Sequence, residues 1–218
     1  MDLKEHIYLN QAGWWWPKHD TPGQGGAWFD LAGPFAETPK KMAGYVPQKR
    51  VVVQAGGNGG LYPKSFSQLF DLVYTFEADP INFACLSLNV TESNVFKFHA
   101  ALGFHRQGIS TANDMFPGNM GAKYVGGTGP IPTLRIDDLG LEVCDLIQLD
   151  IEGFELHALH GAQETITRCH PVLALEFGWE GRYGISRQDI DLFLNAVNYK
   201  LVEALPNGQG DFIYKYAE

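Results

Sequence analysis

Residues 51–60 read Val-Val-Val-Gln-Ala-Gly-Gly-Asn-Gly-Gly, and this stretch decides the fold class of the chain. The three valines form a short apolar run, which is typical of a strand buried in a parallel sheet. A glycine-rich turn follows at once, and residues 61–70 are predicted to be a helix with Pro63 in its first turn. A strand, a glycine-rich turn and a helix in this order form the context that a nucleotide-type binding loop needs.

The alternation of strands and helices continues towards the C-terminus. Further strands are predicted at 71–76, 95–102, 146–149 and 172–175, and helices at 80–89, 137–139, 153–168 and for about 11 residues after Ser186. Such alternation builds parallel βαβ units with right-handed crossovers. The last two strands, 200–205 and 211–216, flank a Pro-Asn-Gly-Gln-Gly hairpin signal. We therefore expect one antiparallel strand at the edge of the sheet.

Two regions depart from this rhythm. Residues 1–50 hold four tryptophans, among them the run Trp14 to Trp16, and no sustained hydrophobic period. We expect an irregular, aromatic-rich segment that forms a lid or cover over a domain spanning residues 51–218. Residues 103–132 are rich in glycine and proline, with room for a short hairpin, and their part 107–129 is a candidate wall for a bound substrate.

The composition of the 218 residues is that of a globular protein, with 45% apolar residues and a net charge of −9. An acidic chain without a basic stripe disfavours a nucleic-acid partner. Three cysteines, far apart in sequence, argue against a disulfide framework. No apolar run is long enough for a membrane span, and the first residues lack a secretory layout, so we expect a cytoplasmic protein.

Glu77 lies 21 residues after Gly56, at the end of the strand predicted at 71–76. A carboxylate in this place can accept hydrogen bonds from both hydroxyl groups of a ribose. For the turn alone, a glycine-rich turn without a ligand is the simplest alternative. The presence of Glu77 at this spacing favours a nucleoside site.

The spacing of the glycines distinguishes between nucleoside cofactors. A dinucleotide loop requires G-x-G-x-x-G, but counting from Gly57 and Gly59 the third position is Tyr62, so this motif fails. A pattern with a key residue at every second position fits better: Gln54, Gly56, Asn58 and Gly60.

These residues resemble the FkbM family of S-adenosylmethionine-dependent methyltransferases. The family pattern D-x-G-x-N-x-G is similar to residues 54–60, and its acidic residue after the second strand corresponds to Glu77. Residues 145–155, Asp-Leu-Ile-Gln-Leu-Asp-Ile-Glu-Gly-Phe-Glu, resemble the family signature D-L-I-K-I-D-V-E-G-x-E. The stretches 100–103, 133–139 and 171–176 complete the resemblance, which covers about residues 50–178.

The resemblance implies an α/β fold of the Rossmann-like class I methyltransferases. This is a seven-stranded, mostly parallel sheet with helices on both faces and a C-terminal antiparallel hairpin. It also implies S-adenosylmethionine as the cofactor, held by Gln54, Gly56, Asn58, Gly60, Glu77, Ala101 and Asp150. There is one departure from the family, because Gln54 stands where the motif begins with an aspartate and therefore carries no charge.

Three carboxylates, Asp150, Glu152 and Glu176, are predicted at the carboxyl ends of strands, where an open α/β sheet binds ligands. A hydroxyl group that accepts a methyl group needs a base to take its proton. We assign this catalytic role first to Asp150, for which a helix-start carboxylate is the alternative, and second to Glu152. Substrate binding is assigned to Glu176, Trp179 and Tyr183.

The resemblance thus implies an enzyme that methylates the hydroxyl group of a small molecule such as a saccharide, and we expect no nucleic-acid or membrane partner. No metal is expected, since the pair His157 and His160 falls short of the three or four ligands that zinc requires. Two alternatives stay open. One is a binding protein with this fold that lost turnover, suggested by Gln54, and the other is an NAD-dependent oxidoreductase.

Overall fold

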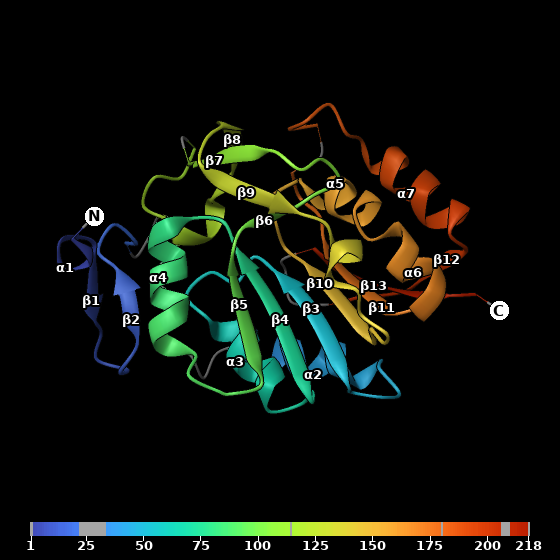
Figure 1. Ribbon diagram of the computed structural model, residues 1–218, viewed down its shortest axis with the longest axis horizontal. Helices are drawn as coiled ribbons and strands as arrows, with labels where there is room; N and C mark the ends of the chain where they lie inside the picture. The colour runs from blue at the N-terminus through green and yellow to red at the C-terminus, as the bar shows by residue number, and fades with distance from the viewer. Residues whose placement is uncertain (1, 22–33, 114, 180, 206–209, 218) are drawn as a thin grey trace.

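A seven-stranded sheet forms the centre of the molecule, in a computed structural model that describes residues 2–21, 34–113, 115–179, 181–205 and 210–217 (Figure 1). The sheet has the strand order β12-β13-β11-β10-β3-β4-β5. Its strands are β3 (Val51–Ala55), β4 (Leu72–Glu77), β5 (Val95–His99), β10 (Leu146–Leu149), β11 (Val172–Glu176), β12 (Tyr199–Ala204) and β13 (Asp211–Tyr216). The first five of these run parallel, as the sequence predicts.

The antiparallel strand of the sheet is β13, and its place differs from the prediction. It lies between β11 and β12 and pairs antiparallel with both, so it is one position in from the edge. Ile213 and Tyr214 on β13 are buried, whereas Leu201 and Val202 on β12 are about half exposed. β13 is therefore the covered strand, and β12 forms the edge of the sheet.

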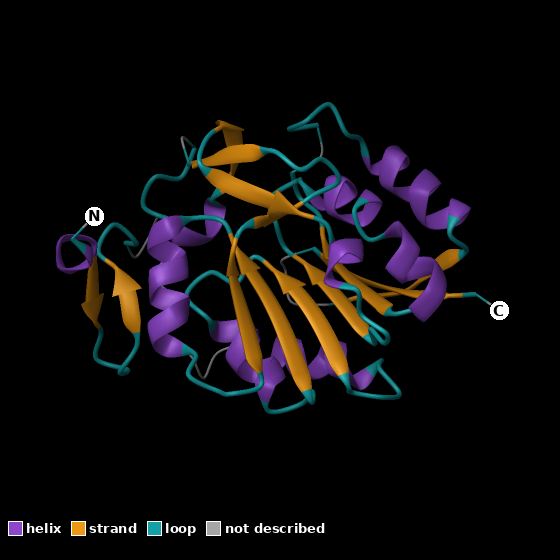
Figure 2. Cartoon of the chain, in the orientation of Figure 1, coloured by secondary structure: helices purple, strands orange, loops and turns teal. Residues whose placement is uncertain are grey.

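Helices cover both faces of the sheet (Figure 2). On one face lie α2 (Pro34–Gly44), α3 (Leu61–Ser67) and α4 (Pro80–Asn89), and on the other α5 (Glu155–His160), α6 (Gln163–Cys169) and α7 (Arg187–Ala196). Alternate residues of each strand point to opposite faces. Accordingly Val52 packs in the cluster with α2, α3 and α4, while Val51 and Val53 pack in the cluster with α5, α6 and α7.

The single helix predicted at 153–168 is broken into α5 and α6. Asp137 causes the break, because its carboxylate accepts hydrogen bonds from the backbone N–H groups of Glu164 and Thr165 and so caps a new helix. Gly161 lies at the junction, where a Cβ atom would come within 2.4 Å of the Gly103 carbonyl oxygen. The capping box predicted at Ser186 and Asp189 is confirmed at the start of α7.

The region 103–132 forms most of a second, smaller sheet with the order β6-β9-β7-β8. Its strands are β6 (Ala101–Leu102), β7 (Gly108–Ala112), β8 (Tyr124–Thr128) and β9 (Ile131–Leu134), with short 3-10 helices η1 (Met120–Ala122) and η2 (Ile136–Leu139). The strand predicted at 95–102 is therefore wrong in length. It ends at His99, and the chain turns at the buried Ala100 to pair β6 with β9. In Figure 1 this sheet lies above the carboxyl ends of β3, β4 and β5.

The N-terminal segment is more regular than the sequence suggests. It contains α1 (Leu3–His6), a hairpin of β1 (Ile7–Leu9) and β2 (Trp15–Pro17), and the helix α2. The hairpin lies beside α4 (Figure 1). Trp16 is buried against the glycine-rich turn, since a Cβ atom on Gly59 would be 3.0 Å from its indole ring.

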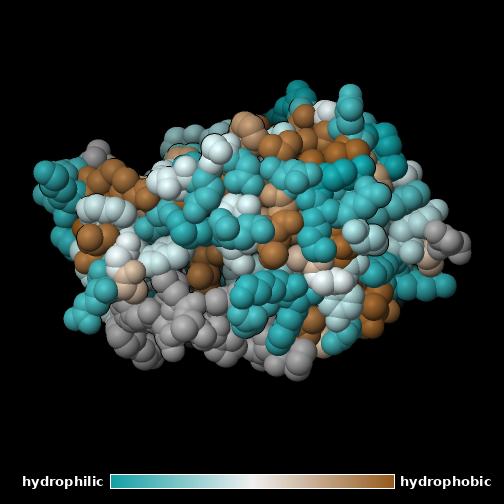
Figure 3. Space-filling view, turned by 90° about the horizontal axis from the view of Figure 1, so that it is seen from below, coloured by the Kyte–Doolittle hydropathy of each residue, from teal (hydrophilic) through white to brown (hydrophobic). Residues whose placement is uncertain are grey.

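The outer surface is mixed in polarity. On the face drawn in Figure 3, hydrophobic residues lie in separate groups between hydrophilic ones. None of the helices within the described ranges combines the length and the hydropathy that a membrane crossing requires.

Asn89 joins the N-terminal hairpin to the domain. Its side-chain carbonyl accepts from the Trp15 N–H at 2.7 Å, and its amide group donates to the carbonyl oxygens of Trp15 and Gly59 at 2.8 and 2.7 Å. Asn89→Ala leaves these buried groups without partners, so we expect it to lower the free energy of unfolding by about 2–4 kcal/mol. Urea denaturation measures this. Asn195→Ala, at an exposed position on α7, is the control and should change it by less than about 0.5 kcal/mol.

Candidate active site

A cavity of about 730 Å³ opens at the carboxyl ends of the central strands. Its walls come from the glycine-rich turn, the ends of β4, β10 and β11, and the smaller sheet with its connections. Eight of the residues assigned to the site from the sequence line it: Gly56, Asn58, Glu77, Ala101, Asp150, Glu152, Glu176 and Trp179. The topology thus brings together carboxylates that lie up to 99 residues apart in the chain.

The glycine-rich turn packs tightly against the protein itself. Gly56 has a φ of +83°, and a Cβ atom there would lie 1.9 Å from the carbonyl oxygen of Asp150. The N–H groups of Gly56 and Gly57 both donate to the Phe76 carbonyl, at 3.1 and 2.9 Å. Only glycine fits at position 56, because a side chain would overlap the backbone of β10.

Glu77 lies at the floor of the cavity and is 6% exposed. One carboxylate oxygen accepts from the Asn58 N–H at 2.6 Å and the other from the Asp79 N–H at 2.7 Å. Each oxygen keeps one further lone pair for a ligand. Burial, followed by the charge of Asp79, raises the pKa of Glu77 to about 7.

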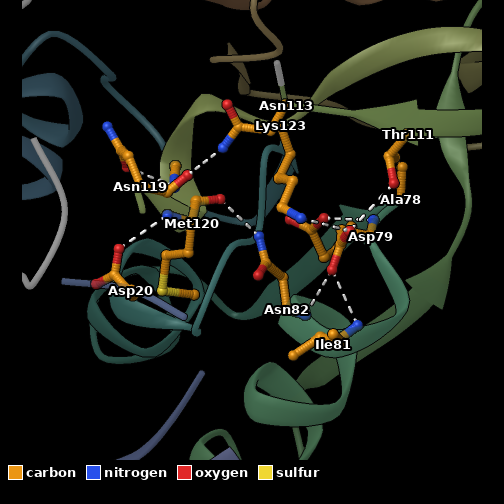
Figure 4. Close-up of polar contacts among 12 residues, drawn as sticks. Asp20, Ala78, Asp79, Ile81, Asn82, Thr111, Asn113, Asn119, Met120 and Lys123 are labelled. Carbon is orange, nitrogen blue, oxygen red and sulfur yellow. Dashed lines mark hydrogen bonds and ion pairs between the residues drawn. The ribbon is translucent and has the colours of Figure 1, made fainter. Parts of the chain in front are cut away.

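Asp79 fastens the smaller sheet over this end of the cavity (Figure 4). One of its carboxylate oxygens accepts from the N–H groups of Ile81 and Asn82 and caps α4. The other accepts from the Thr111 hydroxyl at 3.1 Å and lies 3.3 Å from the Lys123 ammonium group. This carboxylate therefore supports a helix start and holds a cavity wall at the same time.

Met120, in the same wall, is held by two side chains from distant segments. Asp20 accepts from the Met120 N–H at 2.8 Å, and the Asn82 amide donates to the Met120 carbonyl at 2.9 Å (Figure 4). Asp20 also accepts from the Trp16 indole N–H at 2.7 Å. The N-terminal segment thereby contacts both the glycine-rich turn and the cavity wall.

Asp150 and Glu176 form a carboxyl–carboxylate pair across the ends of β10 and β11. The two side chains are within hydrogen-bonding reach of each other. Two adjacent carboxyl groups cannot both ionise at low cost, so they share a proton. Burial raises the pKa of both groups, and the charge of Asp150 adds to this for Glu176.

Glu152 is also buried, in the turn that follows β10. Its side chain accepts a hydrogen bond from the Trp179 indole, whereas its Oε2 atom has no hydrogen-bond partner. The nearest cationic group is Arg182, with Nη1 at 3.7 Å from Oε2. Burial, followed by the charge of Asp150, raises the pKa of Glu152 to about 8.

Glu155 supports the turn that carries Glu152. One of its oxygens accepts from the N–H groups of Ile151 and Gly153 at 3.0 and 3.3 Å. Glu155 is 3% exposed, and burial raises its pKa to about 7. Its position explains why the sequence repeats an acidic residue three places after Glu152.

Three of the residues assigned to the site do not line the cavity. The side chain of Gln54 is fully buried beside the neighbouring strand β4, where it accepts a hydrogen bond from the Thr75 hydroxyl at 2.5 Å. Gly60 has a left-handed φ of +102°, and a Cβ atom there would lie 2.6 Å from Val90, so this position requires glycine. The Tyr183 hydroxyl donates to the Val125 carbonyl at 3.0 Å, so this ring supports the wall from outside.

Other cavity residues gave no recognisable signal in the sequence. Asn82, Lys123, Tyr124 and Phe154 line the cavity, and the segment 107–129 that holds two of them was expected only as a candidate wall. In the described parts of the chain, no group of three or more His, Cys, Asp or Glu side chains is placed to hold a metal ion.

The model of the methyltransferase FkbM domain family matches residues 62–201, which is more than half of the chain. The chain belongs to the FkbM methyltransferase domain family. The match begins just after the glycine-rich turn and includes Glu77 and the acidic ends of β10 and β11. No curated protein sequence matches the chain.

Two solved structures carry the same fold. A methyltransferase FkbM from Methylobacillus flagellatus KT has a TM-score of 0.54 at 20% identity, over 84% of this chain and 48% of that one. A TehB-like SAM-dependent methyltransferase from Corynebacterium glutamicum ATCC 13032 Kitasato has a TM-score of 0.51 at 16% identity, over 88% and 94%. The present chain spans about half the length of the FkbM protein. The family and the sheet order confirm the predicted Rossmann-like methyltransferase fold and support S-adenosylmethionine as its cofactor.

The raised pKa values in this FkbM domain set the sign of its pH dependence. Glu77, Glu152 and Glu155 titrate at about 7, 8 and 7 in the fold, above the value of about 4.3 for an unfolded chain. Their protonated forms stabilise the fold at low pH, and this stability is lost as the pH rises through the folded pKa values. We expect the free energy of unfolding without ligand to fall by on the order of 7 kcal/mol between pH 5.5 and pH 8.5.

Urea denaturation across this range measures the decline, and Glu152→Gln should flatten its upper part. A free energy of unfolding that is constant or rises with pH would contradict the raised pKa values of these buried groups.

Proposed function

We propose that this chain transfers the methyl group of S-adenosylmethionine to a hydroxyl group of a small molecule, with a saccharide as the acceptor class. One observation carries the proposal. The buried carboxylate of Glu77, beside the glycine-rich turn, shares a single cavity with the carboxyl groups of Asp150, Glu152 and Glu176. The first suits a ribose, and the other three suit a positively charged group next to it.

The charge of the cavity fits this cofactor. Asp150, Glu152 and Glu176 have raised pKa values, and Oε2 of Glu152 is buried without a hydrogen bond. The Arg182 cation offsets only part of this charge, so ionisation of the three groups stays unfavourable. A ligand with a sulfonium and an ammonium group supplies that positive charge, whereas an anionic ligand would be repelled.

The residues that would hold the cofactor follow from this division of the cavity. Glu77 would accept the ribose hydroxyl protons, with Gly56, Asn58 and Ala101 beside it. Asp150, paired with Glu176, would face the amino end. Gln54 and Gly60 would act indirectly, by fixing the strand and the turn, since they do not line the cavity.

When bound, S-adenosylmethionine supplies a methyl group on a positively charged sulfur, ready for displacement by a nucleophile. The chain has to orient the acceptor hydroxyl and remove its proton. Glu152 suits the role of base better than Asp150 does. Asp150 shares a proton with the adjacent Glu176 carboxyl group, whereas Oε2 of Glu152 is buried without a hydrogen-bond partner.

The acceptor side of the cavity is aromatic and apolar. Phe116 and Trp179 meet edge to face with ring centroids 6.0 Å apart, and Met115 beside them is 61% exposed. Rings of this kind pack on the apolar face of a sugar. Together with the nearby carboxylates, they favour a neutral acceptor over a phosphorylated or carboxylated one.

The alternative of a binding protein without turnover rested on Gln54. Because Gln54 is buried in the sheet and bonded to Thr75, its lack of charge leaves the carboxylates of the cavity in place. We therefore favour the enzyme. The alternative of an NAD-dependent oxidoreductase has no support in the family of the chain.

The cofactor part of the proposal is tested by calorimetry with S-adenosylmethionine. We expect binding to release protons, because a cation lowers the pKa values of the acidic groups around it. Glu77→Gln should weaken binding by about 10- to 100-fold through the loss of charged hydrogen bonds. The exposed Glu142→Gln is the control and should bind as the parent does. Proton uptake, or equal affinity for Glu77→Gln, would argue against a cofactor site at Glu77.

The chemical part is tested by transfer of a radiolabelled methyl group to a panel of neutral methyl glycosides and to sugar phosphates. Glu152→Gln should lower the turnover by at least about 100-fold and leave the affinity for S-adenosylmethionine within about threefold. Full turnover by this variant would exclude Glu152 as the base. Preferential labelling of the sugar phosphates would overturn the proposed acceptor class.

A further inference from the structure

Arg182 lies in the loop between β11 and α7. Its guanidinium group packs between two aromatic rings, 4.0 Å from the centroid of Tyr124 and 4.4 Å from that of Trp179. Tyr124 belongs to the smaller sheet and Trp179 to the loop itself, and both line the cavity. The Arg182 side chain is only 14% exposed.

The same guanidinium reaches Glu152. Its Nη1 donates to the Glu152 carbonyl oxygen at 2.8 Å and lies 3.7 Å from Oε2 of that side chain. Glu152 has a φ of +59°, in the left-handed region that is strained for a residue with a side chain unless its surroundings hold it. A hydrogen bond to the carbonyl of that residue is one such restraint.

The loop and the turn around Glu152 also pack directly together. A Cβ atom added to Gly153 would lie 3.0 Å from the Trp179 carbonyl oxygen and 3.6 Å from Cβ of Arg182. The Tyr183 hydroxyl extends the contact to the Val125 carbonyl on β8. Three segments that are separate in sequence therefore meet at one guanidinium group.

From these contacts we propose that Arg182 is a positioning residue, which holds the Glu152 carboxylate in place and joins the three segments of the acceptor-side wall. The catalytic meaning of this role rests on the proposed function, in which Glu152 takes the proton of the acceptor. Arginine suits this position because its planar guanidinium group can stack on two rings while its N–H groups donate in the guanidinium plane. Lysine cannot do both at the same time.

The charges around Glu152 give Arg182 a second effect. Asp150 and Glu155 raise the pKa of Glu152, and Glu176 lies close enough to be affected by it in turn. The indole of Trp179 and the charge of Arg182 act in the opposite direction. Among the largest charge effects on Glu152, that of Arg182 is the one that favours its ionisation. Its removal should make Glu152 harder to ionise.

The experiment is a pH titration of the full chain, labelled with ¹³C at the glutamate side-chain carboxyl carbons and followed by NMR, with Glu152→Gln identifying the Glu152 signal. We expect Arg182→Gln to raise the pKa of Glu152 by at least about half a unit. Arg182→Lys keeps the charge and should leave this pKa near that of the parent. Both variants should speed hydrogen exchange at the Gly153 amide by about tenfold or more, because both lose the bridging geometry.

Arg187→Gln is the matched control. The Arg187 guanidinium is also stacked between two rings, 4.0 Å from Phe177 and 4.6 Å from Phe212, but it does not contact Glu152. It should move neither the pKa of Glu152 nor the exchange of Gly153. An unchanged pKa in Arg182→Gln, or an equal shift in Arg187→Gln, would overturn the proposal.

The titration needs no acceptor, so its result is separate from that of the proposed function. If Glu152→Gln keeps full turnover while Arg182→Gln shifts the pKa, the coupling of the two residues stands and the role of Glu152 as base fails. If Glu152→Gln abolishes turnover while Arg182→Gln leaves both the pKa and the exchange unchanged, the base stands and the positioning role of Arg182 fails.

Discussion

The close approach of Gly56 to the carbonyl oxygen of Asp150 is the contact on which the site depends. It brings the turn after β3 against the end of β10, so that the glycine-rich turn and the acidic strand ends border one cavity. The glycine at position 56 is required by this packing alone, before any ligand is considered. The proposed ligand site therefore depends on the carboxylates that this contact brings together, with Glu77 on one side and Asp150 on the other.

Burying those carboxylates close together is electrostatically unfavourable for the fold. Burial and mutual repulsion raise the pKa values of Glu152 and Glu176, and Arg182 balances only part of the charge. Groups perturbed in this way gather where a protein binds or reacts. A cationic cofactor would remove the imbalance, so the same feature links the stability of the empty domain to its affinity for the methyl donor.

The wall over the cavity is fixed at two ends by charged side chains of opposite sign. Asp79 holds it next to the proposed ribose site through Thr111 and Lys123. Arg182 holds it next to the proposed acceptor site through Tyr124. Each anchor also supports a residue or helix of the cavity floor, so the position of the wall and the geometry of the site are set by the same contacts.

The sequence by itself determined the alternation of strands and helices, the capping of α7 and the place of Glu77 at a strand end, because hydrophobic period and local residue chemistry encode these features. The family signature did the same for Asp150 and Glu152. The burial of Gln54 against Thr75 and the contact of Arg182 with Glu152 are set by the tertiary structure alone. These facts depend on which segments distant in the chain become neighbours, and no local pattern of residues records that.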